Sequence, residues 1–515
     1  EDLSGGLSID SFDGLSGVTV SNADGTASGN DHITIRASSP LSVTAGDPVV
    51  NNDGGNIVLA AEGAGPGDDL TLDDNVRVTN GDGAIDGVGN IYLYAGDTVN
   101  FAAGTVVVSV DAAGTVLLSA GSNYNNGSPQ DGHSGGDILM TSGSAVRSED
   151  GDITLLAPND VQLSLVSADS DGDTTAGDVI VTADYAGPNP GALSDGTGAI
   201  RDSLAPSEAP NIVGDQLALR AGSGIGSGVS GDADIDTAVR TLAAVTESGD
   251  INVHDLGVGL TIDMFDGLSG VTITDALASD SGDDITIVTR GNLTVSANDP
   301  VVNHDGGDIT LRAAGGGGYQ RISGSFTFAQ AQADAAARGG YLATIRSAAE
   351  NAVVLAVSGG TPAWIGASDG ASEGDWRWGA GPDNGMAFWS GAAAGSPVGG
   401  EYSNWAAGQP GGVAAQNAAH LQADGTWDDG DASVTRAYVL EFPDANVVVN
   451  AAVRVTGGTG MIRLEADNDV TGDAAGDITT AEGDVTITAD LDGSSFSGTN
   501  ANGTIQLEGD IAAGA

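Results

Sequence analysis

Residues 2–59 read DLSGGLSIDSFDGLSGVTV…DPVVNNDGGNIVL, and residues 255–311 read DLGVGLTIDMFDGLSGVTI…DPVVNHDGGDITL. The two stretches align along their whole length with a single one-residue gap. The matched pairs include Leu7 and Leu260, Phe12 and Phe265, Val20 and Ile273, and Ile57 and Ile309. Two copies about 250 residues apart indicate a tandem array, so the chain is best interpreted repeat by repeat.

Short runs of β-type residues recur throughout the chain, and most follow a Gly-Asp or Gly-Asn pair. Examples are GNIVL (55–59), GDITL (151–155), GDVIV (177–181) and GDVTI (483–487). Three such runs, each followed by a turn, fill the 24 residues from Ile33 to Ile57, which fits one coil of a three-sided β-solenoid. Alternation of Ile, Val or Leu with Thr or Ser places one face of each run in the core and the other in water.

We therefore predict a mainly β fold with a right-handed-type parallel β-solenoid shaft. A compact β-sandwich is the competing interpretation, because short strands separated by turns also describe one. Long runs and aromatic anchors are scarce outside one region, which favours the solenoid. The interval 200–215 is expected to be an irregular loop. The Gly-Asp-Ile-Thr-Leu coils resemble those of large secreted bacterial adhesins of the filamentous haemagglutinin type.

The second copy is interrupted where the first continues. In copy one, Gly63 leads through a short segment to VRVT (76–79), whereas in copy two the equivalent Gly315 opens about 130 different residues before VRVT returns at 453–456. All six tryptophans lie in this insert, as do two helical patterns at 326–340 and 347–360, each ending at Gly-Gly. The predicted domains are a solenoid at 1–316, an inserted α+β domain at 317–444 and the resumed solenoid at 445–515.

The insert resembles a bacterial C-type lectin-like domain over about 319–442. The segments that carry the resemblance are FTFAQAQADAAARGGYLATI (326–345), AWIGASDGASEGDWRW (363–378), YSNWAAGQPGG (402–412), DGTWDDGD (424–431) and YVLEF (438–442). Family members commonly bind carbohydrate through Ca²⁺, which takes six to eight oxygen ligands and accepts vicinal sugar hydroxyls among them. The resemblance therefore implies calcium and carbohydrate binding, with a cis peptide bond before Pro410.

Carried over position by position, the resemblance implies calcium and sugar ligands at Gln409, Gln416, Asp428 and Asp429. Gly411 stands where the family has a further ligand and offers no side chain. Asp369 and Glu373 match an auxiliary calcium site whose other positions here are not acidic, and a hydrogen-bonding role for Glu373 in the turn before Trp376 is also expected. Two alternatives stay open: a lectin-like fold kept as a rigid display module, and protein binding through the same surface.

The amino-acid composition further limits the classes of function that are expected. The net charge of −56 disfavours nucleic acid as a partner, because phosphates would be repelled. The 15 basic residues are all arginine, and 59 of the 71 acidic residues are aspartate, which suits turns, Ca²⁺ ligation or adaptation to high salt. No cysteine is present, and no apolar run is long enough for a membrane span. The five histidines are scattered, lysine is absent, and no catalytic constellation stands out, so we expect no enzyme.

The sequence thus predicts a structural and adhesive segment or subunit of an extracellular bacterial fibre, located at the cell surface. Both ends stop in coil-like sequence, so successive copies or neighbouring repeats are expected to stack head to tail. The alternative is a Ca²⁺-dependent carbohydrate-binding adhesin in which the solenoid is only a spacer. The expected partners are the protein itself and glycans or a host or neighbouring cell surface.

Overall fold

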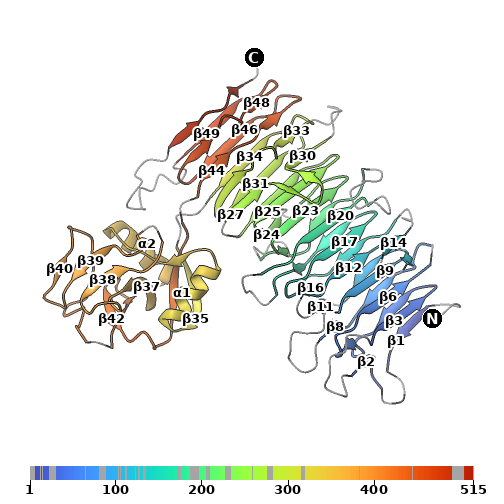
Figure 1. Ribbon diagram of the computed structural model, residues 1–515, viewed down its shortest axis with the longest axis horizontal. Helices are drawn as coiled ribbons and strands as arrows, with labels where there is room; N and C mark the ends of the chain where they lie inside the picture. Colours follow the sequence, from blue (N-terminus) through green and yellow to red (C-terminus); the bar gives the residue numbers. More distant parts are fainter. Residues whose placement is uncertain are drawn as a thin grey trace.

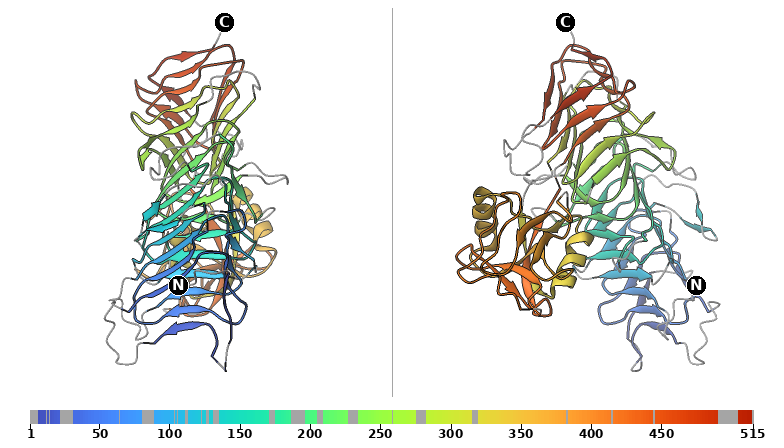
Figure 2. Two further views of the ribbon diagram at one scale, coloured as in Figure 1. Left: turned by 90° about the vertical axis from the view of Figure 1, so that its right-hand side faces the viewer. Right: turned by 60° about the vertical axis from the view of Figure 1, so that its left-hand side comes forward.

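The computed structural model describes residues 6–11, 13, 15–21, 31–63, 65–79, 89–102, 104, 106–110, 113–121, 123–125, 128–130, 135–170, 175–185, 196–204, 209–226, 234–257, 259–274, 282–314, 319–381, 383–413, 415–443, 445–489 and 504–513. Phe12, which pairs with Phe265 in the sequence alignment, lies outside this set. An elongated stack of strands forms the shaft, and a separate domain projects beside it (Figures 1 and 2).

The shaft consists of parallel ladders that run along its length, with one strand added by each coil. One sheet has seven strands: β1 (Leu7–Ile9), β4 (Leu41–Val43), β7 (Leu70–Leu72), β10 (Val99–Phe101), β15 (Ile138–Met140), β18 (Val161–Leu163) and β21 (Ile200–Asp202). A second has thirteen: β2 (Val18–Val20), β5 (Val49–Asn51), β8 (Val76–Val78), β11 (Val107–Val110), β16 (Ala145–Ser148), β19 (Leu165–Ser167), β22 (Ile212–Val213), β24 (Ile235–Ala238), β26 (Ile251–Asp255), β31 (Ile285–Thr289), β34 (Ile309–Ala313), β46 (Ile462–Ala466) and β49 (Val485–Thr488).

A third ladder begins as one sheet and then forks. Its common part is β3 (Ile33–Ala37), β6 (Ile57–Ala61), β9 (Ile91–Ala95), β12 (Val116–Ser119), β17 (Ile153–Ala157), β20 (Val179–Ala183), β23 (Gln216–Ala221) and β25 (Thr241–Thr246). Beyond β25 one branch is β27 (Gly259–Ile262), β32 (Asn292–Val295), β44 (Val447–Val449), β47 (Val470–Gly472) and β50 (Ile505–Leu507). The other is β30 (Val271–Ile273), β33 (Val301–Asn303), β45 (Val453–Val455), β48 (Ile478–Thr480) and β51 (Ile511–Ala512).

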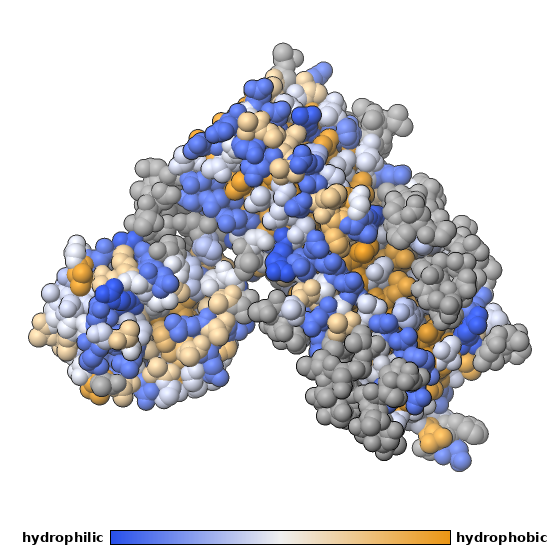
Figure 3. Space-filling view, in the orientation of Figure 1, coloured by the Kyte–Doolittle hydropathy of each residue, from blue (hydrophilic) through white to orange (hydrophobic). Residues whose placement is uncertain are grey.

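These parallel ladders confirm the solenoid and exclude the sandwich. Ile, Leu and Val at alternate positions of each strand point inward and form one continuous core along the shaft. The interval 200–215, predicted to be an irregular loop, contains the short strands β21 and β22, so the prediction was wrong for these strands, whereas the described residues between them belong to no strand or helix. The outward-facing row Val58, Tyr92, Leu117, Thr154 and Ile180 of the third ladder is apolar except at Thr154, and Figure 3 shows hydrophobic residues gathered along this side of the shaft.

Aspartates and asparagines just before the strands tie each coil to the next. The Asp284 carboxylate accepts a hydrogen bond from the Asp308 backbone amide at 2.7 Å, and the Asp308 carboxylate accepts one from the Met461 amide at 2.8 Å. In copy one the Asn56 side-chain oxygen accepts a hydrogen bond from the Asn90 backbone amide at 2.9 Å, and the Asn90 side-chain oxygen accepts one from the Thr115 amide at 2.8 Å. The short Asx side chain reaches the next amide along the shaft axis, so this ladder accounts for much of the bias of aspartate over glutamate.

The shaft continues in register across the insert. Strand β34 precedes the insert and pairs with β46, which follows it, while Leu293 pairs with Val447 and Val301 with Val453. The insert therefore leaves from a corner between two coils and returns to the same corner.

The inserted domain has a mixed sheet with two helices. Its elements are β35 (Tyr319–Phe326), α1 (Phe328–Ala337), β36 (Tyr341–Leu342), α2 (Ala348–Ser358), β37 (Ala363–Ser368), β38 (Asp375–Trp378), β39 (Ala387–Ser390), β40 (Ser396–Pro397), β41 (Ala418–Leu421), β42 (Trp427–Gly430) and β43 (Arg436–Glu441). Both predicted helices are present, and each begins with a capping box, at Thr327 and Ser347. Two small antiparallel hairpins sit on the shaft: β13 (Asn123–Asn125) with β14 (Ser128–Gln130), and β28 (Met264–Phe265) with β29 (Leu268–Ser269).

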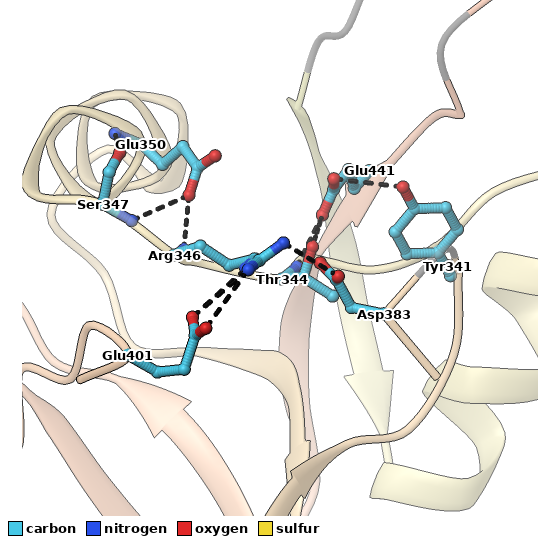
Figure 4. Close-up of polar contacts among 8 residues, drawn as sticks. All are labelled: Tyr341, Thr344, Arg346, Ser347, Glu350, Asp383, Glu401 and Glu441. Carbon is cyan, nitrogen blue, oxygen red and sulfur yellow. Dashed lines mark hydrogen bonds and ion pairs between the residues drawn. The ribbon is translucent and has the colours of Figure 1, made fainter. Parts of the chain in front are cut away.

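A buried polar network lies at the base of the inserted domain (Figure 4). Tyr319 near its start pairs with Glu441 near its end, so Glu441 lies where the two chain ends meet. The Glu441 carboxyl accepts hydrogen bonds from the Thr344 amide and hydroxyl at 2.5 and 2.8 Å, and from the Tyr341 hydroxyl at 3.1 Å. Burial raises the pKa of Glu441 to about 8, although these hydrogen bonds act to lower it.

Arg346 stands beside this network and joins two loops. Its guanidinium forms ion pairs with Asp383 at 3.1 Å and with Glu401 at 3.3 Å (Figure 4). No helix in the described part of the chain is long and apolar enough to cross a membrane.

Candidate functional site

The loop between β40 and β41 is held against strand β42 at the position predicted from the sequence. The peptide bond between Gln409 and Pro410 is cis, as expected. The backbone amide of Gly411 donates a hydrogen bond of 2.7 Å to Asp429 Oδ2, and Gln416 Nε2 donates one of 3.2 Å to the Asp429 carbonyl. Asp429 thus holds the loop at two points, Gly411 and Gln416.

Three side-chain oxygens converge on the space beside Gly411. A Cβ placed on Gly411 would lie 3.3 Å from Gln409 Oε1, 3.4 Å from Gln416 Oε1 and 3.5 Å from Asp429 Oδ1. The Gln409 and Asp429 oxygens of this trio are buried and accept no hydrogen bond in the described part of the molecule. We call Gln409, Gln416 and Asp429 the oxygen cluster.

The oxygen cluster has the chemistry of a weak cation site. Buried oxygens without donors lose their hydration energy unless a cation or a donor reaches them. Ca²⁺ takes oxygen ligands, and three of its six to eight could come from here. The cluster contributes a single carboxylate, and no group of three or more His, Cys, Asp or Glu side chains suited to a metal occurs among the described residues. The residues therefore fit Ca²⁺ with few charged ligands.

Asp428 is directed away from the oxygen cluster, because successive residues of a strand point to opposite faces. Its Oδ2 accepts a hydrogen bond of 2.9 Å from Gln422 and lies 4.0 Å from His420 Nε2. Burial lowers the pKa of His420 to about 4, helped by the nearby charge of Arg436, so this imidazole is neutral at pH 7. Of the four residues predicted to bind Ca²⁺ and sugar, the structure brings together three and separates Asp428.

Asp369 and Glu373 lie near the cluster and interact with it electrostatically. Asp369 is buried, and its Oδ2 accepts a hydrogen bond of 2.8 Å from the Gly374 amide while its Oδ1 has no donor. Burial raises the pKa of Asp369, and the charges of Glu373 and Asp429 add to the rise. Burial likewise raises the pKa of Asp429, with Asp428 and Glu373 contributing.

The turn before Trp376 is held by Asp369 and not by Glu373. The Ser372 amide donates to the Asp369 carbonyl at 2.9 Å, and Gly374 donates to its side chain. Glu373 makes no hydrogen bond within the described ranges, so the role expected for it was wrong. A short aspartate reaches the turn amides more easily than a glutamate does.

Buried aromatic side chains hold strand β42, and with it the site, in position. Trp427 precedes the two aspartates on β42, is fully buried and donates from Nε1 to Asn351 Oδ1 at 2.7 Å. Asn351 in turn donates to the Gly425 carbonyl at 2.9 Å, which ties helix α2 to the turn before β42. The Trp376 and Trp405 rings lie 4.7 Å apart next to this core. The sequence showed the tryptophans but not the partner of Trp427, since Asn351 lies 76 positions away.

Fold and site together define a β-solenoid that carries an inserted C-type lectin-like domain. Residues 325–442 match the family model described as Lectin C-type domain. Over 261 residues the chain is 31% identical to halomucin of Haloquadratum walsbyi. This match covers 49% of this chain and 3% of halomucin. The chain thus spans only a small part of the length of the curated relative that it matches.

Solved structures of carbohydrate-recognition domains and of an antifreeze protein match about a quarter of the chain. The mouse scavenger receptor C-type lectin carbohydrate-recognition domain is 24% identical, covers 24% of this chain and 87% of its own, and has a TM-score of 0.20. A calcium-independent type II antifreeze protein is 22% identical over 24% of this chain and 82% of its own, with a TM-score of 0.19. The cow carbohydrate-recognition domain of CD23 is 25% identical over 24% and 84%, with a TM-score of 0.20.

Proposed function

We propose that this chain is a structural and adhesive segment of an extracellular fibre, in which the β-solenoid shaft displays the lectin-like domain at the cell surface. The domain would span 317–444, with shaft at 1–316 and 445–515. Coils would stack head to tail on neighbouring coils, and the displayed domain would meet glycans or another cell surface.

The observation that carries this proposal is the continuous register of the shaft across the insert. Strands before and after the domain pair directly, Leu293 with Val447 and Val301 with Val453. Each coil of a solenoid contacts only its neighbours, so a domain in a corner loop leaves the rest of the stack unchanged. The match to halomucin covers only 3% of that far longer protein, which supports a role as one segment of a larger assembly.

The chain itself supplies a matched control for a test. In copy one the same corner is closed by the short segment Gly63–Asp68, which corresponds to residues 315–445 in copy two. Replacing 315–445 by that segment should leave an intact shaft without its domain. Cells or beads that carry the parent chain should bind a target surface, and those that carry the short version should not. Equal binding by both would refute the adhesive role.

A second function, Ca²⁺-dependent carbohydrate binding, is favoured by the oxygen cluster. Gln409, Gln416 and Asp429 would hold Ca²⁺ and leave open positions for water or for vicinal hydroxyls of a sugar. Asp369 and Glu373 would add negative charge nearby. Asp428 has no part in this proposal, because it faces Gln422.

Calorimetry with Ca²⁺ on the full chain tests this second function directly. We expect weak binding that Gln409→Ala and Asp429→Asn abolish and that Asp428→Asn leaves unchanged. A glycan array probed with and without Ca²⁺ then tests sugar binding. Sugar binding that survives a chelator, or Ca²⁺ binding that survives both cluster substitutions, would exclude the oxygen cluster as the site.

A further inference from the structure

One asparagine of the shaft belongs to a motif that is modified covalently in exported proteins. Asn292, Leu293 and Thr294 form Asn-X-Thr with X other than proline, which is the acceptor motif for N-linked carbohydrate. The same kind of motif begins at Asn126 and at Asn502, both of which lie outside the described residues. Because so short a motif also arises by chance, the structural setting of the asparagine has to be examined.

Asn292 is exposed, and its side-chain amide is held in one orientation. It is the first residue of β32, and its Oδ1 accepts hydrogen bonds from the backbone amide and from Nδ2 of Asn446, both at 2.9 Å. A backbone amide only donates, so the atom that faces Asn446 is the oxygen. Nδ2 of Asn292 lies on the other side of the planar carboxamide and donates no hydrogen bond within the described part of the chain. The nitrogen to which a sugar is attached is therefore available.

The coil before Asn292 leaves room beside it. Gly259 of β27 is its partner in the ladder, and a Cβ placed on Gly259 would lie 3.1 Å from the Asn292 carbonyl oxygen and 3.7 Å from its Cβ. Glycine thus removes the side chain that would crowd Asn292 from this side. Thr294 follows two residues later and projects from the same face of the strand, between half-buried Thr261 and Val448 of the adjacent coils. Both side chains of the motif are thus presented on one outer face.

Attachment of a sugar to Nδ2 leaves the contacts of the shaft intact. An N-glycosylated carboxamide keeps its carbonyl oxygen and one N–H. Both hydrogen bonds that Asn292 makes to the next coil use the oxygen. In contrast, Asn446 and Asn51 use Nδ2 to bond Asn292 Oδ1 and the Asp31 carbonyl, and neither asparagine belongs to the motif. The fold therefore tolerates a substituent at Asn292.

Copy one contains the same coil without an acceptor. Leu41 takes the place of Leu293 in its ladder, so Pro40 stands where copy two has Asn292. Proline has no side-chain amide, and this coil of copy one cannot be modified at the equivalent place. The chain thus supplies its own unmodified counterpart.

We propose that Asn292 carries N-linked carbohydrate. The donor is an oligosaccharide joined through phosphate or diphosphate to a polyisoprenoid lipid. Nδ2 forms a bond to C1 of the first sugar, the bond between C1 and the phosphate oxygen breaks, and one proton passes from Nδ2 to the released lipid phosphate. The inference rests on the proposed extracellular location, because exported chains receive this modification. The carbohydrate lies beside Asn446, where the chain returns from the lectin-like domain to the shaft.

Mass spectrometry of the chain isolated from the surface of its own cells tests the proposal. Cleavage after arginine releases residues 291–312, in which Asn292 carries the only acceptor motif, and residues 37–77 of copy one, which contain none. We expect most copies of 291–312 to carry hexose or hexosamine mass and 37–77 to carry none. A 291–312 peptide that is mainly unmodified, whether or not Asn126 and Asn502 are modified, would overturn the proposal.

Substitutions in the full chain test the motif itself. Thr294→Val should abolish modification of Asn292, whereas Thr294→Ser, which keeps the hydroxyl, should retain it. Asn292→Asp keeps an oxygen for Asn446 and removes the nitrogen, so it should abolish modification while hydrogen exchange of β32 and β44 shows that the shaft is still folded. Carbohydrate on 291–312 in Thr294→Val or in Asn292→Asp would overturn the assignment to this motif.

Failure of this inference is distinguishable from failure of the proposed function. A surface chain with a bare Asn292 would contradict the carbohydrate site alone. A chain that proteases added to intact cells do not reach would overturn the proposed location, and this inference with it. The corner-replaced chain keeps both Asn292 and Asn446, so its adhesion and its modification are measured separately.

Discussion

The stacked aspartates of the shaft hold the coils together but also repel one another. Removing one of these charges is therefore expected to change the stability of the shaft. Asp284 follows Asp250 in one ladder, its backbone amide donating to the Asp250 carboxylate at 2.8 Å, and it precedes Asp308. Burial raises the pKa of Asp284, and the charges of Asp308 and Asp250 add to the rise. Asp284→Asn keeps the oxygen that accepts the Asp308 amide and removes the charge.

The magnitude follows from the spacing of the coils. Two unit charges ~4.8 Å apart, the distance between adjacent strands, repel by about 0.9 kcal/mol in water and by about 3.5 kcal/mol at an effective dielectric constant of 20. Arg463 pairs with Asp308 at 2.8 Å and offsets part of the repulsion, so the charges of Asp308 and Asp250 together act on Asp284 with less than their full strength. We expect Asp284→Asn to stabilise this part of the shaft by about 1–2 kcal/mol at low salt.

Native-state hydrogen exchange of β31 and β34 measures this gain, since 1–2 kcal/mol slows exchange through local opening by about 5- to 30-fold. The gain should shrink in 1 M salt, where the screening length is about 3 Å. It should also shrink as pH falls. A carboxyl whose pKa is raised in the folded state destabilises the fold at pH 7, and protonation removes that penalty as pH drops towards its ordinary pKa of 3.8.

Asn90→Asp is the matched control for this experiment. Asn90 holds the same kind of position, but the ladder residues on either side, Asn56 and Thr115, are uncharged. A charge placed there should change exchange little at any salt concentration. Faster exchange in Asp284→Asn, or a gain that is as large in 1 M salt as at low salt, would refute the view that repulsion between stacked carboxylates destabilises the shaft.

Three further predictions concern the lectin-like domain, whose unfolding tryptophan fluorescence reports because it contains all six tryptophans. Glu441→Gln should stabilise the domain above pH 8 by up to about 5 kcal/mol and should have no such effect at pH 4. The reason is that the pKa of Glu441 is raised from 4.5 to about 8 in the folded state, so ionisation of this carboxyl lowers the stability of the domain as pH rises from 4.5 to 8. A stabilisation that does not depend on pH would contradict this. Gly411→Asp should tighten Ca²⁺ binding at least tenfold by calorimetry, since it adds a carboxylate among three oxygens, and unchanged affinity would place the metal elsewhere. Asn351→Ala should lower the unfolding free energy by about 2–3 kcal/mol by leaving the buried Trp427 Nε1 without an acceptor, whereas Asn404→Ala, which removes only a second donor to the Gly425 carbonyl, should cost less.

The local pattern of apolar and polar residues was sufficient to predict most of the fold. The β-runs at 55–59, 151–155 and 177–181 became β6, β17 and β20, because a solenoid strand pairs with the same kind of strand one coil away and needs no distant partner. The insert was located because two copies of one repeat could be aligned on either side of it. The strands β21 and β22 were missed, since runs of two or three residues give no alternation to recognise.

The site was harder to predict than the fold, because it depends on which way side chains point. Asp428 and Asp429 are adjacent in sequence and were treated alike, but on strand β42 they face opposite sides, and only Asp429 reaches the loop. The loss of a ligand at Gly411 was visible in the sequence. That Gln409, Gln416 and Asp429 would surround the gap was not, because it depends on the path of the loop between β40 and β41.

The side of the shaft on which the domain lies depends on coils that no sequence motif distinguished from the others. In copy one the corner at Gly63–Asp68 connects β6 of the third ladder to β7 of the seven-stranded sheet. In copy two the equivalent corner connects β34 of the thirteen-stranded sheet to β44 in a branch of the third ladder. The change occurs in residues 216–255, where β25 supports both β27 and β30, so that copy two begins on the next face of the shaft. The coil that contains β25 therefore also sets the side of the shaft from which the lectin-like domain emerges. A change in the number of such two-sided coils would turn the domain around the shaft without altering its site.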